Sequence, residues 1–285
     1  MAQLLDGRSL AKLVNAETKQ RVLALADRHI VPGIAVIMVG DDPASRIYTR
    51  NKERKAHQLG IKSVLKHYPN DIDQQSLLRE IELLNADESI DGIMIQKPLP
   101  PHLNETELIN AIQPAKDADG FHPLNLGKLF DGQPGHYPVS CTPRGIMRLI
   151  HHYQVPLSGA RAVIIGRSIL VGKPLAALLL NADATVTIAN HSTENLQQLT
   201  SEADLLIVAA GKTHLIHQAD VKPGATVIDV GMHRLVNGHL TGDVDYDSVE
   251  PVAGMITPVP GGVGPMTIAS LMSQTVDLAE WRRNG

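Results

Sequence analysis

The chain has 285 residues, 43% of them hydrophobic, so it can bury one large core or two of ordinary size, and we expect two domains. It carries 26 basic against 30 acidic residues and only 3% aromatic residues, which argues against a nucleic-acid partner, because neither a basic surface nor a set of base-stacking rings is indicated. No apolar block resembles a signal peptide or a membrane span, and the single cysteine, Cys141, cannot form an internal disulfide; we therefore expect a soluble, cytoplasmic protein without a membrane partner.

The first half of the chain alternates short apolar runs with helical stretches. We expect strands at Gly33 to Val39, Lys62 to His67 and Ile90 to Ile95, with helices near residues 44–59 and 74–85 between them. Such alternation is typical of a parallel sheet covered by helices. A stretch rich in Pro and Gly, from Lys97 to Pro143, interrupts it and predicts loops and a domain junction.

The second half predicts a doubly wound unit. Its expected helices cover residues 143–153 and 172–181, and its expected strands cover residues 160–165, 185–188, 205–209 and 226–230. A last helix, from about Met266 to Trp281, is expected to pack back on the N-terminal domain. The predicted fold class is α/β, with a catalytic domain of residues 1–142 plus 265–285 and a Rossmann-like domain of residues 143–264.

The apolar run that ends at Ile165 leads into a glycine-bearing turn and a helix start. Gly166 would let the chain turn sharply, Gly172 would let the loop lie close to the helix, and the free amides of the helix would face a pyrophosphate. Because the two glycines stand six residues apart, the pattern differs from the usual dinucleotide fingerprint. An ordinary strand-to-helix loop therefore remains an alternative.

The segment after the next strand distinguishes between the two nicotinamide cofactors. An NAD enzyme usually presents an acidic residue there to the ribose hydroxyls, whereas this chain has Asn190, His191 and Ser192. Together with Arg167, His191 and Ser192 could accept a 2'-phosphate. The sequence therefore favours NADP as the cofactor.

A candidate reactive site is spread over three segments of the first half. Tyr48 and Lys52 are four residues apart in a predicted helix and so share one face, although a solvated surface pair would show the same spacing. Gln96 follows a predicted parallel strand, and Asp119 lies in a turn-rich loop. The carboxyl ends of parallel strands are where open sheets bind their ligands, which favours a site for these residues.

Six motifs occur in a fixed order along nearly the whole chain. They are Tyr48-x-x-x-Lys52, Gln96-x-Pro98-Leu-Pro100, Lys116-Asp-x-Asp119-Gly-Phe-His, Cys141-Thr-Pro143, Gly166-Arg-Ser-x-x-Val-Gly-x-Pro174 and Thr257-Pro-Val-Pro-Gly-Gly-Val-Gly-Pro-Met-Thr267. In this order they resemble the methylenetetrahydrofolate dehydrogenase/methenyltetrahydrofolate cyclohydrolase family. The resemblance implies NADP-dependent oxidation of a folate one-carbon unit, its subsequent hydrolysis, and a homodimer.

The resemblance also implies residue roles. Lys52 would be the acid/base of hydrolysis, Tyr48 would stack on the folate, Gln96 would position Lys52, and Asp119 would bind the pterin. The substrate cleft would be lined by Pro260, Gly261, Gly262, Val263 and Gly264. The expected cofactor-binding residues are Gly166, Arg167, Ser168, Val171, Gly172, His191, Ser192 and Met232.

Several alternatives stay open on the sequence. The family usually has His-Ser one position earlier than His191-Ser192, so the residue that meets a 2'-phosphate is undecided. Cys141 could be imagined as a nucleophile, but neither reaction needs a thiol, and no metal site is expected because the histidines lack ligand spacing. The rival functions are an oxidoreductase of the same build acting on a keto or amino acid, and a folate-binding protein that has lost turnover.

Overall fold

The structure, a computed structural model, describes residues 2–284 and divides into two compact units. The N-terminal unit contains Leu13–Cys141 and the chain from Ile268 onward; the central unit contains Thr142–Thr267 and the chain up to Lys12. The long helices α1 (Gly7–Ala26) and α10 (Val263–Asn284) contribute several residues to both units. The first residues, which the sequence-based division placed in the catalytic domain, pair through β1 (Gln3–Leu4) with the sheet of the central unit.

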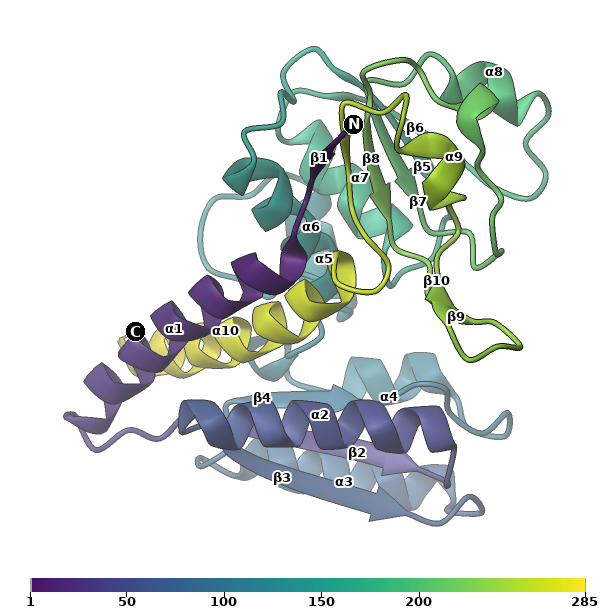
Figure 1. Ribbon diagram of the computed structural model, residues 1–285. Helices are drawn as coiled ribbons and strands as arrows, with labels where there is room; N and C mark the ends of the chain where they lie inside the picture. Colours follow the sequence, from purple (N-terminus) through teal and green to yellow (C-terminus); the bar gives the residue numbers. More distant parts are fainter. Residues whose placement is uncertain (1, 285) are drawn as a thin grey trace. The chain divides into compact units, whose positions relative to one another are not determined.

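The N-terminal unit is built on a three-stranded parallel sheet. Its strands lie in the order β3 (Lys62–Tyr68), β2 (Gly33–Val39) and β4 (Gly92–Ile95). Helices α2 (Pro43–Leu59) and α3 (Gln74–Ala86) connect these strands and lie on opposite sides of the sheet (Figure 1). Two connections through helices are what a parallel arrangement requires.

Alternation along these strands divides the core into two clusters. Ile34 and Val36 of β2 and Met94 of β4 pack in a cluster with residues of α1, α2 and α10. Their strand neighbours pack with α3 and with α4 (Glu105–Ala111) in the other cluster. Because side chains alternate between faces with a period of two, Gln96 follows Met94 on the α2 side of the sheet.

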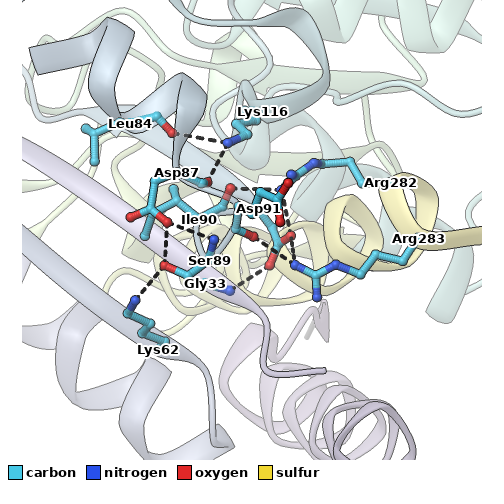
Figure 2. Close-up of polar contacts among 11 residues, drawn as sticks. Gly33, Lys62, Leu84, Asp87, Ser89, Ile90, Asp91, Lys116, Arg282 and Arg283 are labelled. Carbon is cyan, nitrogen blue, oxygen red and sulfur yellow. Dashed lines mark hydrogen bonds and ion pairs between the residues drawn. The ribbon is translucent and has the colours of Figure 1, made fainter. Parts of the chain in front are cut away.

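The final helix is tied to the beginning of the N-terminal sheet by a buried carboxylate. Asp91 is fully buried, accepts the backbone N–H of Gly33 at 2.9 Å, and pairs with Arg282 at 2.8 Å and Arg283 at 3.1 Å (Figure 2). Arg282 also donates to the carbonyl of Ile90 at 2.9 Å. These bonds satisfy a charge that would otherwise be costly to bury. The expected return of the last helix to the N-terminal domain is thus confirmed.

A second buried charge lies beside this carboxylate. The ammonium of Lys116 donates to the carbonyls of Leu84 at 3.1 Å and Asp87 at 2.8 Å, in the last turn of α3 and just after it (Figure 2). Those carbonyls have no partner within the helix, and a cation there also complements the helix dipole. Lys116 therefore ends α3 and fixes the segment that leads to Asp119.

The central unit carries the predicted doubly wound sheet. Its strands are all parallel, in the order β1, β11 (Met255–Ile256), β8 (Thr226–Asp229), β7 (Leu205–Val208), β5 (Arg161–Ile165) and β6 (Thr185–Ala189). The helices that belong to it include α6 (Cys141–His152), α7 (Gly172–Leu180), α8 (Leu196–Thr200) and α9 (Tyr246–Val249) (Figure 1). The order reverses between β5 and β7, which is where open sheets of this class bind their ligands.

Several elements were not foreseen from the sequence. Helix α1 covers a segment for which no structure was expected, and α4 and α5 (Pro123–Phe130) lie within the stretch expected to form loops. A hairpin of β9 (His233–Arg234) and β10 (Leu240–Thr241) follows β8. None of the helices within the described chain combines the length and apolar composition that crossing a membrane demands.

Candidate functional site

The proposed acid/base lysine lies against the end of β4. Helix α2 is capped by Asp42, whose carboxylate accepts the N–H of Ser45 at 2.7 Å, and the helix carries Lys52 toward the sheet. The Lys52 ammonium donates to Oε1 of Gln96 at 2.9 Å and lies 3.6 Å from Sδ of Met94. The amide of Gln96 in turn donates to the carbonyl of Lys97 at 2.7 Å, which turns its oxygen toward Lys52. The structure therefore brings Lys52 and Gln96 together.

Burial sets the proton affinity of this site. Burial lowers the pKa of Lys52, and the negative charge of Asp119 acts in the opposite direction without reversing the shift. Burial also raises the pKa of Asp119 to about 6, against the attraction of Lys52. Lysine and carboxylate are thus both shifted toward their neutral forms, as expected for a site that binds a flat, weakly charged ring system.

Asp119 is placed by a rigid turn. The buried carboxylate of Asp117 accepts the N–H groups of Gly120 at 2.9 Å and His122 at 2.8 Å, and the N–H of Ala118 donates to the carbonyl of Ile93 at 3.0 Å. These bonds attach the Asp119 loop to β4. Asp119 therefore lies in the same unit as Lys52, near enough for each to shift the pKa of the other.

Sequence reasoning missed a buried amide that also holds this loop. Gln274 on α10 is fully buried and donates to the carbonyls of Ala118 at 2.8 Å and Val139 at 3.0 Å, while its oxygen accepts the N–H of Val139 at 3.0 Å. A lone amide in an apolar helix was the signal that could have found it. Gln274 fixes the backbone on both sides of the Asp119 turn.

Tyr48 and Cys141 complete the surroundings of Lys52. Tyr48 lies one turn before Lys52 on α2 with 36% of its surface exposed, so its ring can meet a ligand. Cys141 is buried, and its thiol donates to the carbonyl of Ala118 at 3.4 Å. A buried thiol in a hydrogen bond to the backbone fits a structural role better than a nucleophilic one.

The glycine-bearing turn of the central unit has the close packing that a dinucleotide loop requires. Gly166 has φ of +121°, and a Cβ there would lie 2.3 Å from the carbonyl oxygen of Ala209. A Cβ on Gly172 would lie 2.0 Å from the carbonyl oxygen of Gly166. Helix α7 then begins at Gly172 without a side-chain cap, since Val171 precedes it. The N–H of Lys173 donates to the carbonyl of Ser168 at 3.1 Å and Pro174 has none, so the amide of Gly172 is the one in this first turn that can face an anion.

The candidate 2'-phosphate ligands follow two neighbouring strands. Strands β5 and β6 pair in parallel with Ile165 opposite Ala189, so Arg167 and the segment after Ala189 emerge at the same edge of the sheet. Arg167, His191 and Ser192 are exposed there, and positions 190–192 hold no acidic residue. Asn190 uses its side chain to accept the N–H of Ser192 at 3.0 Å, which leaves the cation and hydroxyl as the groups presented to solvent. Ser168, by contrast, accepts the N–H of Val171 at 3.2 Å and shapes the loop.

The remaining predicted residues also lie in the central unit. Met232 is 48% exposed just beyond β8, and the residues from Pro260 to Gly262 form the turn before α10, whose first residues are Val263 and Gly264. The turn is held by the N–H of Arg8, which donates to the carbonyl of Gly261 at 2.8 Å, and by the N–H of Gly262, which donates to the carbonyl of Pro258. Close approach also restricts it, because a Cβ on Gly7 would lie 1.8 Å from the carbonyl oxygen of Gly262.

These two sets of residues define a class of protein. A doubly wound unit with an uncapped helix after a tight glycine loop, and a second α/β unit with a desolvated lysine at the end of a parallel strand, are the parts of a two-domain, nicotinamide-dependent enzyme.

Comparison with known proteins gives the particular family. The catalytic domain of tetrahydrofolate dehydrogenase/cyclohydrolase matches residues 5–119, and the NAD(P)-binding domain of the same family matches residues 140–283. The Bifunctional protein FolD of Limosilactobacillus reuteri is 61% identical over the full length of both chains.

Solved structures agree with this result. The bifunctional FolD enzyme from Campylobacter jejuni is 44% identical with a TM-score of 0.97, covering 99% of this chain and 100% of the other. A Trypanosoma brucei dehydrogenase-cyclohydrolase, solved with NADP cofactor and inhibitor, is 35% identical with a TM-score of 0.96, covering 100% and 99%. The chain belongs to the tetrahydrofolate dehydrogenase/cyclohydrolase family and is a bifunctional enzyme of folate one-carbon metabolism. The rival assignment to a keto- or amino-acid oxidoreductase is thereby excluded.

Proposed function

We propose that the chain uses NADP to oxidise 5,10-methylenetetrahydrofolate to the methenyl form and then hydrolyses that product to 10-formyltetrahydrofolate. The observation that carries the proposal is the pairing of a desolvated Lys52 with the neutral amide of Gln96. The same chain has Asn190, His191 and Ser192 where an NAD enzyme presents an acidic residue. Each of the candidate residues has a distinct role in these two reactions.

Hydride transfer requires the protein to orient the cofactor and the folate, and it requires no proton transfer by a side chain. The cofactor supplies a hydride acceptor, and the folate nitrogen supplies the electrons that push the hydride out, so no strong base is needed. Tyr48 would stack on the folate, Asp119 would hold its pterin, and the turn from Pro260 through Gly264 would line the cleft. Two flat partners held at contact distance gain most of their rate from such positioning.

Hydrolysis needs a group that can take up and return a proton near neutral pH. Water attacks the methenyl carbon, and Lys52 is the group we assign to the proton transfers. Burial already lowers its pKa, and a bound cationic methenyl folate would lower it further by charge repulsion. Gln96 accepts a hydrogen bond from the amine without adding a charge, so it positions Lys52 and leaves the pKa shift intact.

NADP rather than NAD fits the loop chemistry after β6. Arg167, His191 and Ser192 are exposed where β5 and β6 end, and there a 2'-phosphate could meet a guanidinium, an imidazole and a hydroxyl group. The cofactor contacts would be completed by the turn from Gly166 to Gly172, which includes Ser168 and Val171, and by Met232. We assign the 2'-phosphate to the end of the sheet where β5 and β6 finish, without choosing among Arg167, His191 and Ser192 as its contacts.

The assembly and location of the enzyme are also proposals. A homodimer follows from the resemblance to the family, and β3 lies at the edge of its sheet within the described residues, where a second copy could pair, with Leu65 37% exposed on it. The thiol of the single cysteine, Cys141, suits a reducing compartment and hence a cytoplasmic location. Sedimentation of the purified chain would decide the assembly, since a monomer at micromolar concentration would overturn it.

One spectrophotometric experiment tests the function. Incubation with methylenetetrahydrofolate should produce NADPH absorbance with NADP and far less with NAD, and added methenyltetrahydrofolate should lose its own absorbance without any cofactor. Tight folate binding with neither change would favour a binding protein that has lost turnover. A Lys52 pKa still near 10 in the methenyl-folate complex would refute its role as the acid/base.

A further inference from the structure

A pair of buried carboxylates lies at the end of β8, apart from the residues assigned to folate or cofactor. Asp229, the last residue of β8, is 4% exposed and Asp243, just beyond β10, is fully buried. Asp229 accepts the N–H groups of Gly231 at 2.9 Å, Asp243 at 3.0 Å and Val244 at 3.0 Å. Its own N–H donates to the hydroxyl of Thr257 at 2.8 Å, just ahead of the turn that begins α10. One residue therefore fixes three separate loops of the central unit.

Asp243 continues the network to the neighbouring strand. One of its carboxylate oxygens accepts the N–H groups of Ala210 at 2.7 Å and Gly211 at 2.9 Å, directly after β7. The other oxygen meets Nε2 of His233 at 2.7 Å, at the start of the β9–β10 hairpin. The loops after β7 and β8 are thus held to a single buried group.

The same loops form the floor of the proposed dinucleotide site. Val208 pairs with Asp229 in the parallel ladder of β7 and β8, and β7 also pairs in parallel with β5. The loops after all three strands therefore leave the sheet at the same end, the carboxyl ends of the strands. The loop after β7 touches the glycine turn directly, because the carbonyl oxygen of Ala209 fills the space that a Cβ on Gly166 would need. Met232 follows the amide of Gly231 that Asp229 holds. Asp243 is therefore connected to the loops after β7 and β8, which adjoin the glycine turn, and has no direct role in binding the cofactor.

Steric crowding leaves the carboxylates no alternative position. A Cβ on Gly231 would lie 2.4 Å from an oxygen of Asp243, and a Cβ on Gly242 would lie 1.8 Å from an oxygen of Asp229. The two glycines allow the backbone to close around the pair. Such a fully bonded buried network specifies one arrangement of the loops that contribute to it.

We propose that Asp243, supported by Asp229 and His233, is a positioning residue for the dinucleotide: it fixes the loops after β7 and β8 against the Gly166 turn and so sets cofactor affinity in the dehydrogenase reaction. This inference rests on the proposed function, because it takes Gly166 through Gly172 as the cofactor loop. Hydrolysis of methenyl folate uses no nicotinamide, so the network should affect one activity and not the other. A merely structural role would lower both.

The test compares two substitutions of Asp243 in the full-length chain. Asp243→Ala leaves the N–H groups of Ala210 and Gly211 without their acceptor, and should weaken NADPH binding and raise the KM for NADP by about tenfold. Asp243→Asn keeps an oxygen for those amides, and should stay within about threefold of wild type, since the hydrogen bond and not the charge is what positions the loop. In both variants cofactor-free hydrolysis should stay within about twofold of wild type.

A matched control is available at the opposite end of the same strands, where β5 and β7 begin. Asp204 also accepts a backbone N–H, from Arg161 at 2.8 Å, but it stands before β7 rather than after it. Asp204→Ala should leave NADPH affinity unchanged. Titration of NADPH fluorescence gives the dissociation constants for every variant.

Each outcome decides between the inference and its alternatives. Wild-type affinity in folded Asp243→Ala, or equal proportional loss of both activities, would overturn the positioning role. If Asp243→Ala does not accumulate as folded protein, His233→Ala replaces it, and unchanged NADPH affinity in that variant would equally overturn the role. Failure of the unaltered chain to bind NADPH would instead count against the proposed function itself.

Discussion

Ionisation of the buried Asp119 lowers the free energy of unfolding at neutral pH, and a single substitution should remove this cost. Its pKa, ordinarily 3.8, is raised to about 6 by burial, so between these values the folded protein holds a proton that the unfolded chain has lost. The contribution to stability is complete below pH 3.8 and is lost as the pH rises through about 6. At about 1.4 kcal/mol per pKa unit, the folded protein at pH 7 is about 3 kcal/mol less stable than it would be with a group that does not ionise.

Asp119→Asn provides such a group at nearly unchanged volume. We expect the free energy of unfolding at pH 7 to rise by up to about 3 kcal/mol, and most of this gain to disappear at pH 4, where the folded wild type is protonated. Folate binding should weaken at the same time, because the amide cannot replace a carboxylate toward the pterin. The variant would then exchange function for stability, as is common at sites built for ligands.

Trp281 makes the measurement specific to the relevant unit. It is the only tryptophan in the sequence and packs against the core of the N-terminal unit, so its fluorescence follows unfolding of the unit that contains Asp119. Denaturant titrations at pH 7 and pH 4 give both free energies, with Asp131→Asn, an exposed carboxyl of the same unit, as the control for net charge. A variant no more stable than wild type at pH 7, or an equal gain at both pH values, would refute the reasoning.

Three further predictions concern single side chains. Lys52→Met should slow hydrolysis of methenyl folate by about 10²- to 10⁴-fold while hydride transfer continues, and equal loss in the two assays would contradict the separate roles. Asp91→Ala should lower the free energy of unfolding by about 3 kcal/mol, because it leaves Arg282 and Arg283 without their buried carboxylate. Trp281 fluorescence in denaturant measures this free energy, and a change near zero would show that solvent already screens both guanidinium groups. Gly172→Ala should weaken NADPH binding by more than about tenfold, because its Cβ would collide with the Gly166 carbonyl oxygen; unchanged affinity in an NADPH titration would contradict this.

The parts of the fold that the sequence predicted are those with strong periodicity. Strands β2 and β4 are continuous apolar runs because both faces of the sheet are covered, and Gly60, with φ of +83°, ends α2 as a helix-terminating glycine should. Helix α1 was missed although its buried positions follow a helical spacing. A threonine, Thr18, interrupts that stripe, and it can be buried only because its hydroxyl donates to the carbonyl of Val14 at 2.7 Å.

The site was predictable in part from local sequence. Tyr48 and Lys52 share a helix face and Gln96 follows a strand, but this spacing also fits a surface pair, and the resemblance of the ordered motifs was needed to assign the site. The supports of the site could not be predicted in this way. Gln274 reaches the Asp119 turn from 156 residues away, and Asp243 lies 33 residues from Ala210, so neither bond leaves a pattern in a local window of sequence.

The discontinuity of both units has a consequence for how the chain is made. The central unit needs no residue beyond Thr267, so all of its residues are synthesised before the part of α10 that belongs to the N-terminal unit. The earlier-synthesised sheet of β2, β3 and β4 must wait, because Leu271, Met272 and Val276 fill its core and Arg282 neutralises its buried acid. The N-terminal sheet is therefore made first but can complete its core only after the last helix has been synthesised, and until then its apolar face stays exposed.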